Sequence, residues 1–169
     1  EIETCAPCHS RRLSIAGEAP LGGSFLDDYL PQVLHPGLYH PDGQILDEVY
    51  VYGSFIQSRM YRAGVTCSDC HDPHGLGLRA EGNALCTRCH GEQPSQKFPS
   101  LQAKLYDAPS HHRHEAGSEG SECVACHMPE TTYMGIDPRR DHGMKVPRPD
   151  LSESLNVPNA CSGCHADKT

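Results

Sequence analysis

The 169 residues include 3 Phe and no Trp, the apolar fraction is only 37%, and 14 Pro and 16 Gly interrupt the chain. A domain of this length normally needs more Leu, Ile, Val and aromatic side chains to offset chain entropy, so an ordinary side-chain core is excluded and something else must fill the interior. The formal net charge of −8 argues against nucleic acid or an anionic membrane as a partner, and no stretch approaches the ~18 apolar residues of a membrane span.

All ten cysteines fall in five Cys-x-x-Cys-His motifs. Two thiols three positions apart on a helical turn can reach the two vinyl groups of one porphyrin, and the following His then points its imidazole at the iron. The motifs therefore predict five covalently attached haem c groups, which would also fill the interior. The predicted thioether residues are Cys5, Cys8, Cys67, Cys70, Cys86, Cys89, Cys123, Cys126, Cys161 and Cys164, and the predicted proximal iron ligands are His9, His71, His90, His127 and His165.

Disulfides and structural zinc explain these motifs less well. Disulfide pairing gives no reason for a His after every second cysteine. Structural zinc takes four ligands, usually from two Cys-x-x-Cys pairs, so five pairs would leave one stranded. Alternatively, each motif would need one further ligand, and adjacent Cys and His make a poor tetrahedral set.

In chain order, residues 1–66 carry the first motif and a long insert. Within the insert, Gly17–Gly43 is rich in Gly and Pro and is expected to be loop, Val49–Tyr52 to be a short extended piece, and Ser54–Arg62 to be a helix that stops at Gly64. Residues 67–91 hold a close pair of motifs, and 92–169 hold the last two. The pattern predicts a single domain, mostly irregular with short α-helices packed around a haem stack, and little or no β-sheet.

Seven His lie outside the motifs, which is more than five irons need as second axial ligands. His74 cannot easily reach back over its own haem and is expected to reach the neighbouring one on Cys86 and Cys89. The remaining distal candidates are His40, His114 and His142, with His111 or His112 as the fifth, and His35 as the spare. Methionine is the other common distal ligand, but with so many His the four Met are interpreted as packing residues. Two arginine pairs, Arg11–Arg12 and Arg139–Arg140, are equally consistent with binding haem propionates and with lying solvated on the surface.

Three segments, Gly64–Gly75, Cys123–Pro129 and Asp137–His142, resemble the doubled Cys-x-x-Cys-His multihaem cytochromes. That group includes cytochrome c554, pentahaem nitrite reductase and hydroxylamine oxidoreductase, and the resemblance is closest to bacterial proteins that join such a region to tetratricopeptide repeats. The resemblance implies bis-histidine haems packed in alternating parallel and perpendicular pairs. Pentahaem nitrite reductases carry Lys as the proximal ligand of a catalytic haem, whereas all five motifs here end in His, so catalytic residues do not carry over.

These observations predict electron transfer, with redox proteins or the haems of neighbouring subunits as partners. The alternative is an oxidoreductase acting on a small nitrogen or sulfur compound at one open haem. Because motifs stand near both ends of the sequence, we also expect poorly covered end haems that could join copies head to tail into a filament, or flanking segments that cover them. Haem c is attached outside the cytoplasm, so a periplasmic or extracellular location and an upstream leader are expected.

Overall fold

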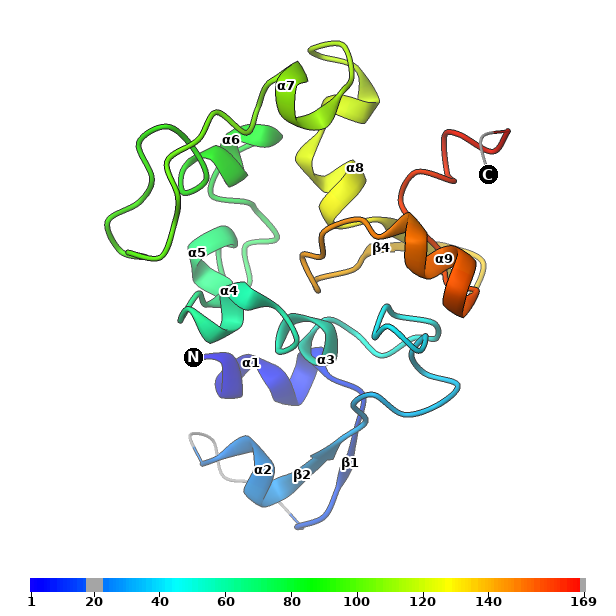
Figure 1. The fold of residues 1–169 in the computed structure, drawn as a ribbon. Helices are drawn as coiled ribbons and strands as arrows, with labels where there is room; N and C mark the ends of the chain where they lie inside the picture. The colour runs from blue at the N-terminus through cyan, green and yellow to red at the C-terminus, as the bar shows by residue number, and fades with distance from the viewer. Residues whose placement is uncertain (18–22, 168–169) are drawn as a thin grey trace.

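The computed structural model describes residues 1–17 and 23–167 (Figure 1). Short helices make up most of the regular structure: α1 (Ile2–His9), α2 (Phe25–Asp28), α3 (Tyr52–Phe55), α4 (Arg59–Arg62), α5 (Cys67–Cys70), α6 (Asn83–Thr87), α7 (Pro109–His112), the 3-10 helix η1 (Glu119–Ser121), α8 (Cys123–His127) and α9 (Pro149–Leu155). The strands are β1 (Arg12–Ser14), β2 (Tyr29–Pro31), β3 (Glu130–Tyr133) and β4 (Asp137–Arg140). The predicted class, mostly irregular with short helices and little sheet, is confirmed.

The strands form two small antiparallel sheets of two strands each. In the first, Leu13 on β1 lies opposite Leu30 on β2. In the second, β3 and β4 are joined by a three-residue turn in which Gly135 takes a φ of +76°. Glycine adopts this left-handed backbone without the steric cost that a Cβ brings.

The expectation of loop throughout Gly17–Gly43 is wrong for its described part, which contains α2 and β2; residues 18–22 lie outside the described residues. The helix expected over 54–62 is split into α3 and α4. The break falls at Ser58, whose hydroxyl accepts a hydrogen bond from the Tyr61 backbone N–H at 3.0 Å and so caps a new helix. A serine that caps a helix has extended backbone and cannot continue the preceding helix.

The motifs themselves fold as single helical turns. The N–H of His71 donates to the carbonyl of Cys67 at 2.9 Å, and His165 donates to Cys161 at 2.8 Å. Such a turn places both cysteines and the His on one side of the backbone, which one porphyrin requires. The turn at Cys67 is further fixed because the Asp69 carboxylate accepts the Thr66 N–H at 2.9 Å.

The buried apolar side chains are few and scattered. They are Ala6, Phe25, Tyr39, Val49, Phe55, Phe98, Tyr133 and Val157. A cluster of three aromatic rings joins α2 to β2 and α3: the Phe25 ring centroid lies 5.4 Å from Tyr29 and 5.1 Å from Tyr52. So small a core agrees with the expectation that side chains alone do not fill the interior.

The motif-bearing helices follow an arc. In Figure 1, α1 lies in the lower half, α5 and α6 lie above it, α8 runs down from the region of α7 toward β4, and the chain then passes through α9 and rises to the C-terminus. The chain after β2 crosses to the side of β4 and α9, so the insert lies beside the last third of the sequence. None of the described helices is both long and apolar enough to cross a membrane.

Candidate haem-binding sites

The first and second motifs lie against each other. Burial raises the pKa of the Cys67 thiol to about 11, and the nearby Cys5 thiol adds to that rise. The N-termini of the two helices are also joined, because Ser68 donates from both its backbone N–H and its hydroxyl to the Glu1 carboxylate, each at 2.8 Å. A thioether has no titratable proton, so the pKa shift of Cys67 describes its free thiol. The shift indicates that the Cys5 and Cys67 sulfur atoms lie near each other.

The second and third motifs are also neighbours. Burial raises the pKa of Cys70, and the charges of Asp69 and Cys89 raise it further. The guanidinium of Arg88, within the third motif, donates to the backbone carbonyl of Asp69, within the second, at 3.3 Å. The Arg88 side chain thus links the turn of the third motif to the backbone of the second.

The third and fourth motifs are neighbours as well. The nearby Cys123 thiol and burial raise the pKa of Cys86, and the Cys86 thiol lowers the pKa of Cys123. Asn83 bridges the two helices: its side-chain carbonyl accepts the Cys123 N–H at 2.8 Å, and its amide donates to the Ser121 carbonyl at 3.0 Å.

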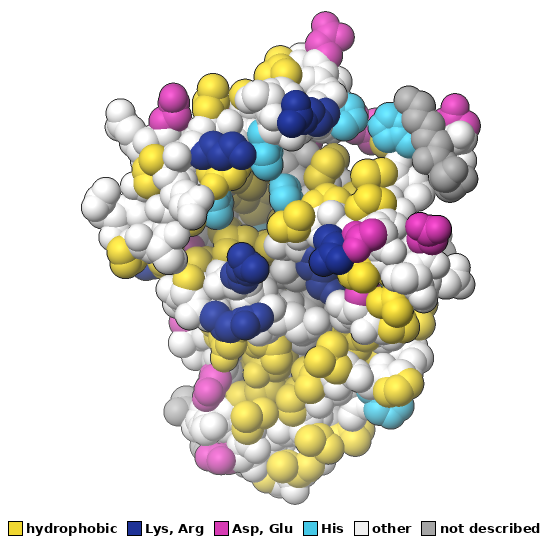
Figure 2. All heavy atoms as spheres, in the orientation of Figure 1, with side chains coloured by type: hydrophobic (Ala, Val, Ile, Leu, Met, Phe, Trp, Pro, Cys, Tyr) yellow, Lys and Arg dark blue, Asp and Glu magenta, His cyan; other side chains and the backbone are white. Residues whose placement is uncertain are grey.

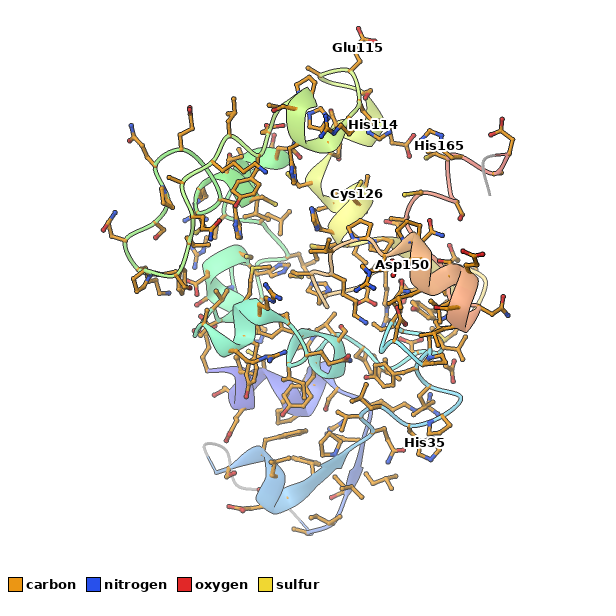
Figure 3. All side chains as sticks on the ribbon, viewed as in Figure 1. His35, His114, Glu115, Cys126, Asp150 and His165 are labelled. Carbon is orange, nitrogen blue, oxygen red and sulfur yellow. The ribbon has the colours of Figure 1, made fainter. Side chains whose placement is uncertain are left out.

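The fourth and fifth motifs complete the succession. Burial raises the pKa of Cys126, and the neighbouring Cys161 and Cys164 thiols add to it. Figure 3 shows His114 beside His165 above Cys126, and the two imidazole centroids lie 5.8 Å apart. The five motifs are therefore neighbours in space in the same order in which they follow one another along the chain.

Three of the five motif His have a second imidazole opposite them. In each case one ring belongs to a motif and the other to a His outside the motifs. The pairs are His71 with His142 at 6.2 Å between centroids and 26° between planes, His127 with His111 at 6.2 Å and 6°, and His165 with His114 at 5.8 Å and 32°.

This spacing fits one metal ion between the two rings. Metal–imidazole bonds are about 2 Å long, so two such bonds on opposite sides of one ion place the ring centroids about 6 Å apart. Nearly parallel rings in face-to-face contact would be closer, since touching carbon atoms lie about 3.5–4 Å apart. The His residues therefore fit a group with an iron bound from both sides.

Each pair also has one ring that is anchored through Nδ1. A backbone carbonyl can only accept, so the ring nitrogen facing it carries the proton and Nε2 keeps its lone pair for a metal. Burial also lowers the pKa of His142, which favours this neutral form. The anchoring bonds run from His142 to the Arg140 carbonyl at 2.9 Å, from His127 to Lys145 at 2.8 Å, and from His114 to His112 at 2.6 Å.

Comparisons with known proteins agree with this geometry. Residues 60–95, which span the second and third motifs, match the doubled CXXCH motif family. The chain is 26% identical over 125 residues to the cytochrome c-type protein NrfB of Escherichia coli O6:H1 (strain CFT073), an alignment that covers 60% of this chain and 65% of that relative. The protein is a multihaem c-type cytochrome.

A solved structure resembles the fold of this multihaem cytochrome over its whole length. The outer cell wall cytochrome OcwA matches with a TM-score of 0.64 and 17% identity, covering 100% of this chain and 49% of the OcwA chain. The cytochrome thus spans less than two thirds of NrfB and about half of OcwA.

The other two motif His lack a facing imidazole among the described residues. His9 is exposed. His90 is half-buried, and the ring opposite it is Tyr106, at 6.1 Å between centroids and 89° between planes. Tyr106 also lies edge-on to His111, at 5.2 Å and 88°.

The remaining His are distributed as follows. His40 is half-buried, whereas His74 is exposed with a left-handed φ of +62°. Exposed His35 lies far from His114 and His165 in Figure 3, although its Nδ1 faces the Pro36 carbonyl at 2.7 Å. His112 accepts the His114 N–H on Nδ1 at 3.2 Å, so in a neutral ring its Nε2 carries the proton and is not free for iron.

Three of the four arginines considered for propionates have protein carboxylates as partners. Arg11 pairs with Asp47, Arg139 with Glu48 and Asp137, and Arg140 with Glu130. Arg12 differs, because its guanidinium lies 4.6 Å over the Tyr29 ring and its buried Nε has no hydrogen-bond partner. Figure 2 shows Lys and Arg gathered across the middle of one face, between an apolar lower part and a His-bearing upper part.

Proposed function

We propose that this cytochrome conducts electrons along five covalently attached haems that follow the order of the motifs. The observation that carries the proposal is the unbroken succession of neighbouring attachment cysteines, from Cys5 beside Cys67 to Cys126 beside Cys161. When bound, each haem supplies one-electron iron chemistry, and the protein sets its position, ligation and access.

The residues that hold the haems follow from the site geometry. The ten motif cysteines form the thioethers and the five motif His are the proximal ligands. We assign His142, His111 and His114 as distal ligands at the second, fourth and fifth motifs. His40 and His74 remain the candidates for the first and third motifs, and His35 and His112 are the spare imidazoles.

The two ends of the succession are the points where electrons enter and leave. Cys8 in the first motif and both Cys161 and Cys164 in the fifth are exposed, whereas the cysteines of the three central motifs are half-buried. Solvent-facing attachment sites suit exchange with a redox partner protein. Covalent haem attachment and the cell-wall location in the name of OcwA support a periplasmic or extracellular place of work. Head-to-tail assembly of copies stays a prediction.

The proposal is tested by haem content and spin state. The intact mass should exceed that of the polypeptide by five haems that survive acid–acetone extraction, and the ferric spectrum should be low-spin throughout. His40→Ala and His74→Ala should each convert one haem to high-spin, while His35→Ala should change nothing. Fewer than five haems would refute the stoichiometry. A high-spin haem in the unaltered protein would favour an oxidoreductase with one open iron.

A further inference from the structure

The short loop 140–145 serves two haem sites that are not neighbours in the succession. Its His142 faces His71 of the second motif at 6.2 Å. The carbonyl of Lys145 accepts the Nδ1–H of His127, in the fourth motif, at 2.8 Å. One loop therefore supplies a ring to one site and fixes the orientation of a ring at another.

This loop is tied to segment 42–45 of the insert. The Lys145 ammonium donates to the Asp42 carbonyl at 2.7 Å, and the Ile45 N–H donates to the Asp141 carboxylate at 3.1 Å. The other oxygen of Asp141 accepts the Gly143 N–H at 2.7 Å, which closes the loop on itself. Both ends of the loop are thus fastened to a segment more than ninety residues earlier in the chain.

The side chain of Lys145 passes close to the backbone at two glycines, Gly43 and Gly143. A Cβ on Gly143 would meet the Lys145 side chain at 3.2 Å, and one on Gly43 would come within 3.3 Å of its ammonium. Gly43 also has a φ of +83°, which favours glycine. None of the described ion pairs includes Lys145. Burial lowers the pKa of its half-buried ammonium, and the nearby Asp42 and Asp141 carboxylates oppose that shift without forming a direct ion pair.

We infer that Lys145 is a positioning residue for the second and fourth haem sites and raises the reduction potentials of both. By fastening its own carbonyl in place, it sets the ring orientation of His127. Through the same loop it limits where His142 can lie. A positive charge held in a poorly solvated place also favours the reduced iron over the oxidised iron, because reduction removes one positive charge nearby. This inference rests on the proposed ligation by His142 and His127.

Three substitutions in the haem-loaded protein separate these roles. Lys145→Met keeps an unbranched chain and removes the ammonium, whereas Lys145→Arg keeps the charge and the donors. Arg148→Met is the matched control, because Arg148 is exposed and pairs with Asp150 alone. The readouts are haem content, the g values of the low-spin ferric signals, and a potentiometric titration.

In Lys145→Met, two low-spin centres should shift in g value and titrate at lower potential, with haem content and spin state unchanged. Lys145→Arg should restore both properties, and Arg148→Met should leave them as they were. Asp141→Asn, which weakens the hydrogen bond from the Ile45 N–H, should shift the g values of the same two centres. If Lys145→Met does not fold, this variant tests whether the loop positions the two rings. Unchanged signals in these variants would overturn the inference, while a His142→Ala variant that stays low-spin would instead refute the ligation on which it rests.

Discussion

The second, fourth and fifth motifs differ from the first and third in the surroundings of the motif His. At the former, a second imidazole faces the motif His, and one ring of each pair is anchored on a backbone carbonyl. At the latter, His9 is exposed and His90 faces a tyrosine. The difference teaches that a backbone carbonyl bonded to Nδ1 orients one ring of each facing pair, a restraint that no described hydrogen bond supplies to His9 or His90.

The largest effect is expected at the second motif. His142→Ala should leave its haem with five ligands and convert it from low-spin to high-spin, because no other described imidazole faces His71. Ferric electron paramagnetic resonance would detect the change. A fully low-spin spectrum would show that His142 is not a ligand and that the facing rings are coincidental.

A smaller and sharper test uses two adjacent His. His111→Ala should convert the fourth-motif haem to high-spin, since His111 lies 6.2 Å from His127. His112→Ala should keep every haem low-spin, because its Nδ1 is already occupied by the His114 N–H. The two variants remove the same group from neighbouring positions and so control for each other. The reverse pattern in the ferric spectra would contradict the assignment.

The smallest effect concerns the bridge between the third and fourth motifs. Asn83→Ala removes the acceptor of the Cys123 N–H and the donors to Asp107 and Ser121. We expect the free energy of unfolding to fall by about 1–3 kcal/mol, the cost of leaving such groups unsatisfied. Denaturant titration measures this. Asn83→Asp keeps the acceptor but sets a second carboxylate against Asp107 and the Ser121 carbonyl, so it should lose at least as much. A change of haem spin state would contradict a purely stabilising role.

The sequence alone could name candidate attachment cysteines and proximal His because the chemistry is local: one helical turn carries all three groups. It also narrowed the distal ligands to a short set, which contains the three His that face motif rings. Sequence spacing could not decide whether His111 or His112 is the distal candidate, because adjacent residues have almost the same spacing from the motif and differ only in where their side chains point. That direction is set by the end of α7, where Arg113 has a φ of +65° and turns the chain so that His112 bonds locally to His114.

Long-range features were beyond the reach of the sequence. No local pattern shows that His142 belongs opposite His71, because that pairing depends on the path of the whole chain. The pairing of β1 with β2 was not predicted either, because the Gly and Pro content of the segment that contains β2 predicted loop. The role of Lys145 was also missed. Its only signals were Gly43 and Gly143, which leave room beside its side chain, and those glycines are separated by most of the chain.

The matching order of motifs in sequence and in space has a consequence for biogenesis. As the chain emerges from its N-terminus, each motif finds the preceding one already in place, so haems can be added one at a time on a growing scaffold. Segment 42–45 is the exception, because its partners lie near Asp141, Lys145 and Pro158. Its contacts can form only once residues 141–158 are present, so the early part of the molecule is joined to the late part only after most of the chain has emerged.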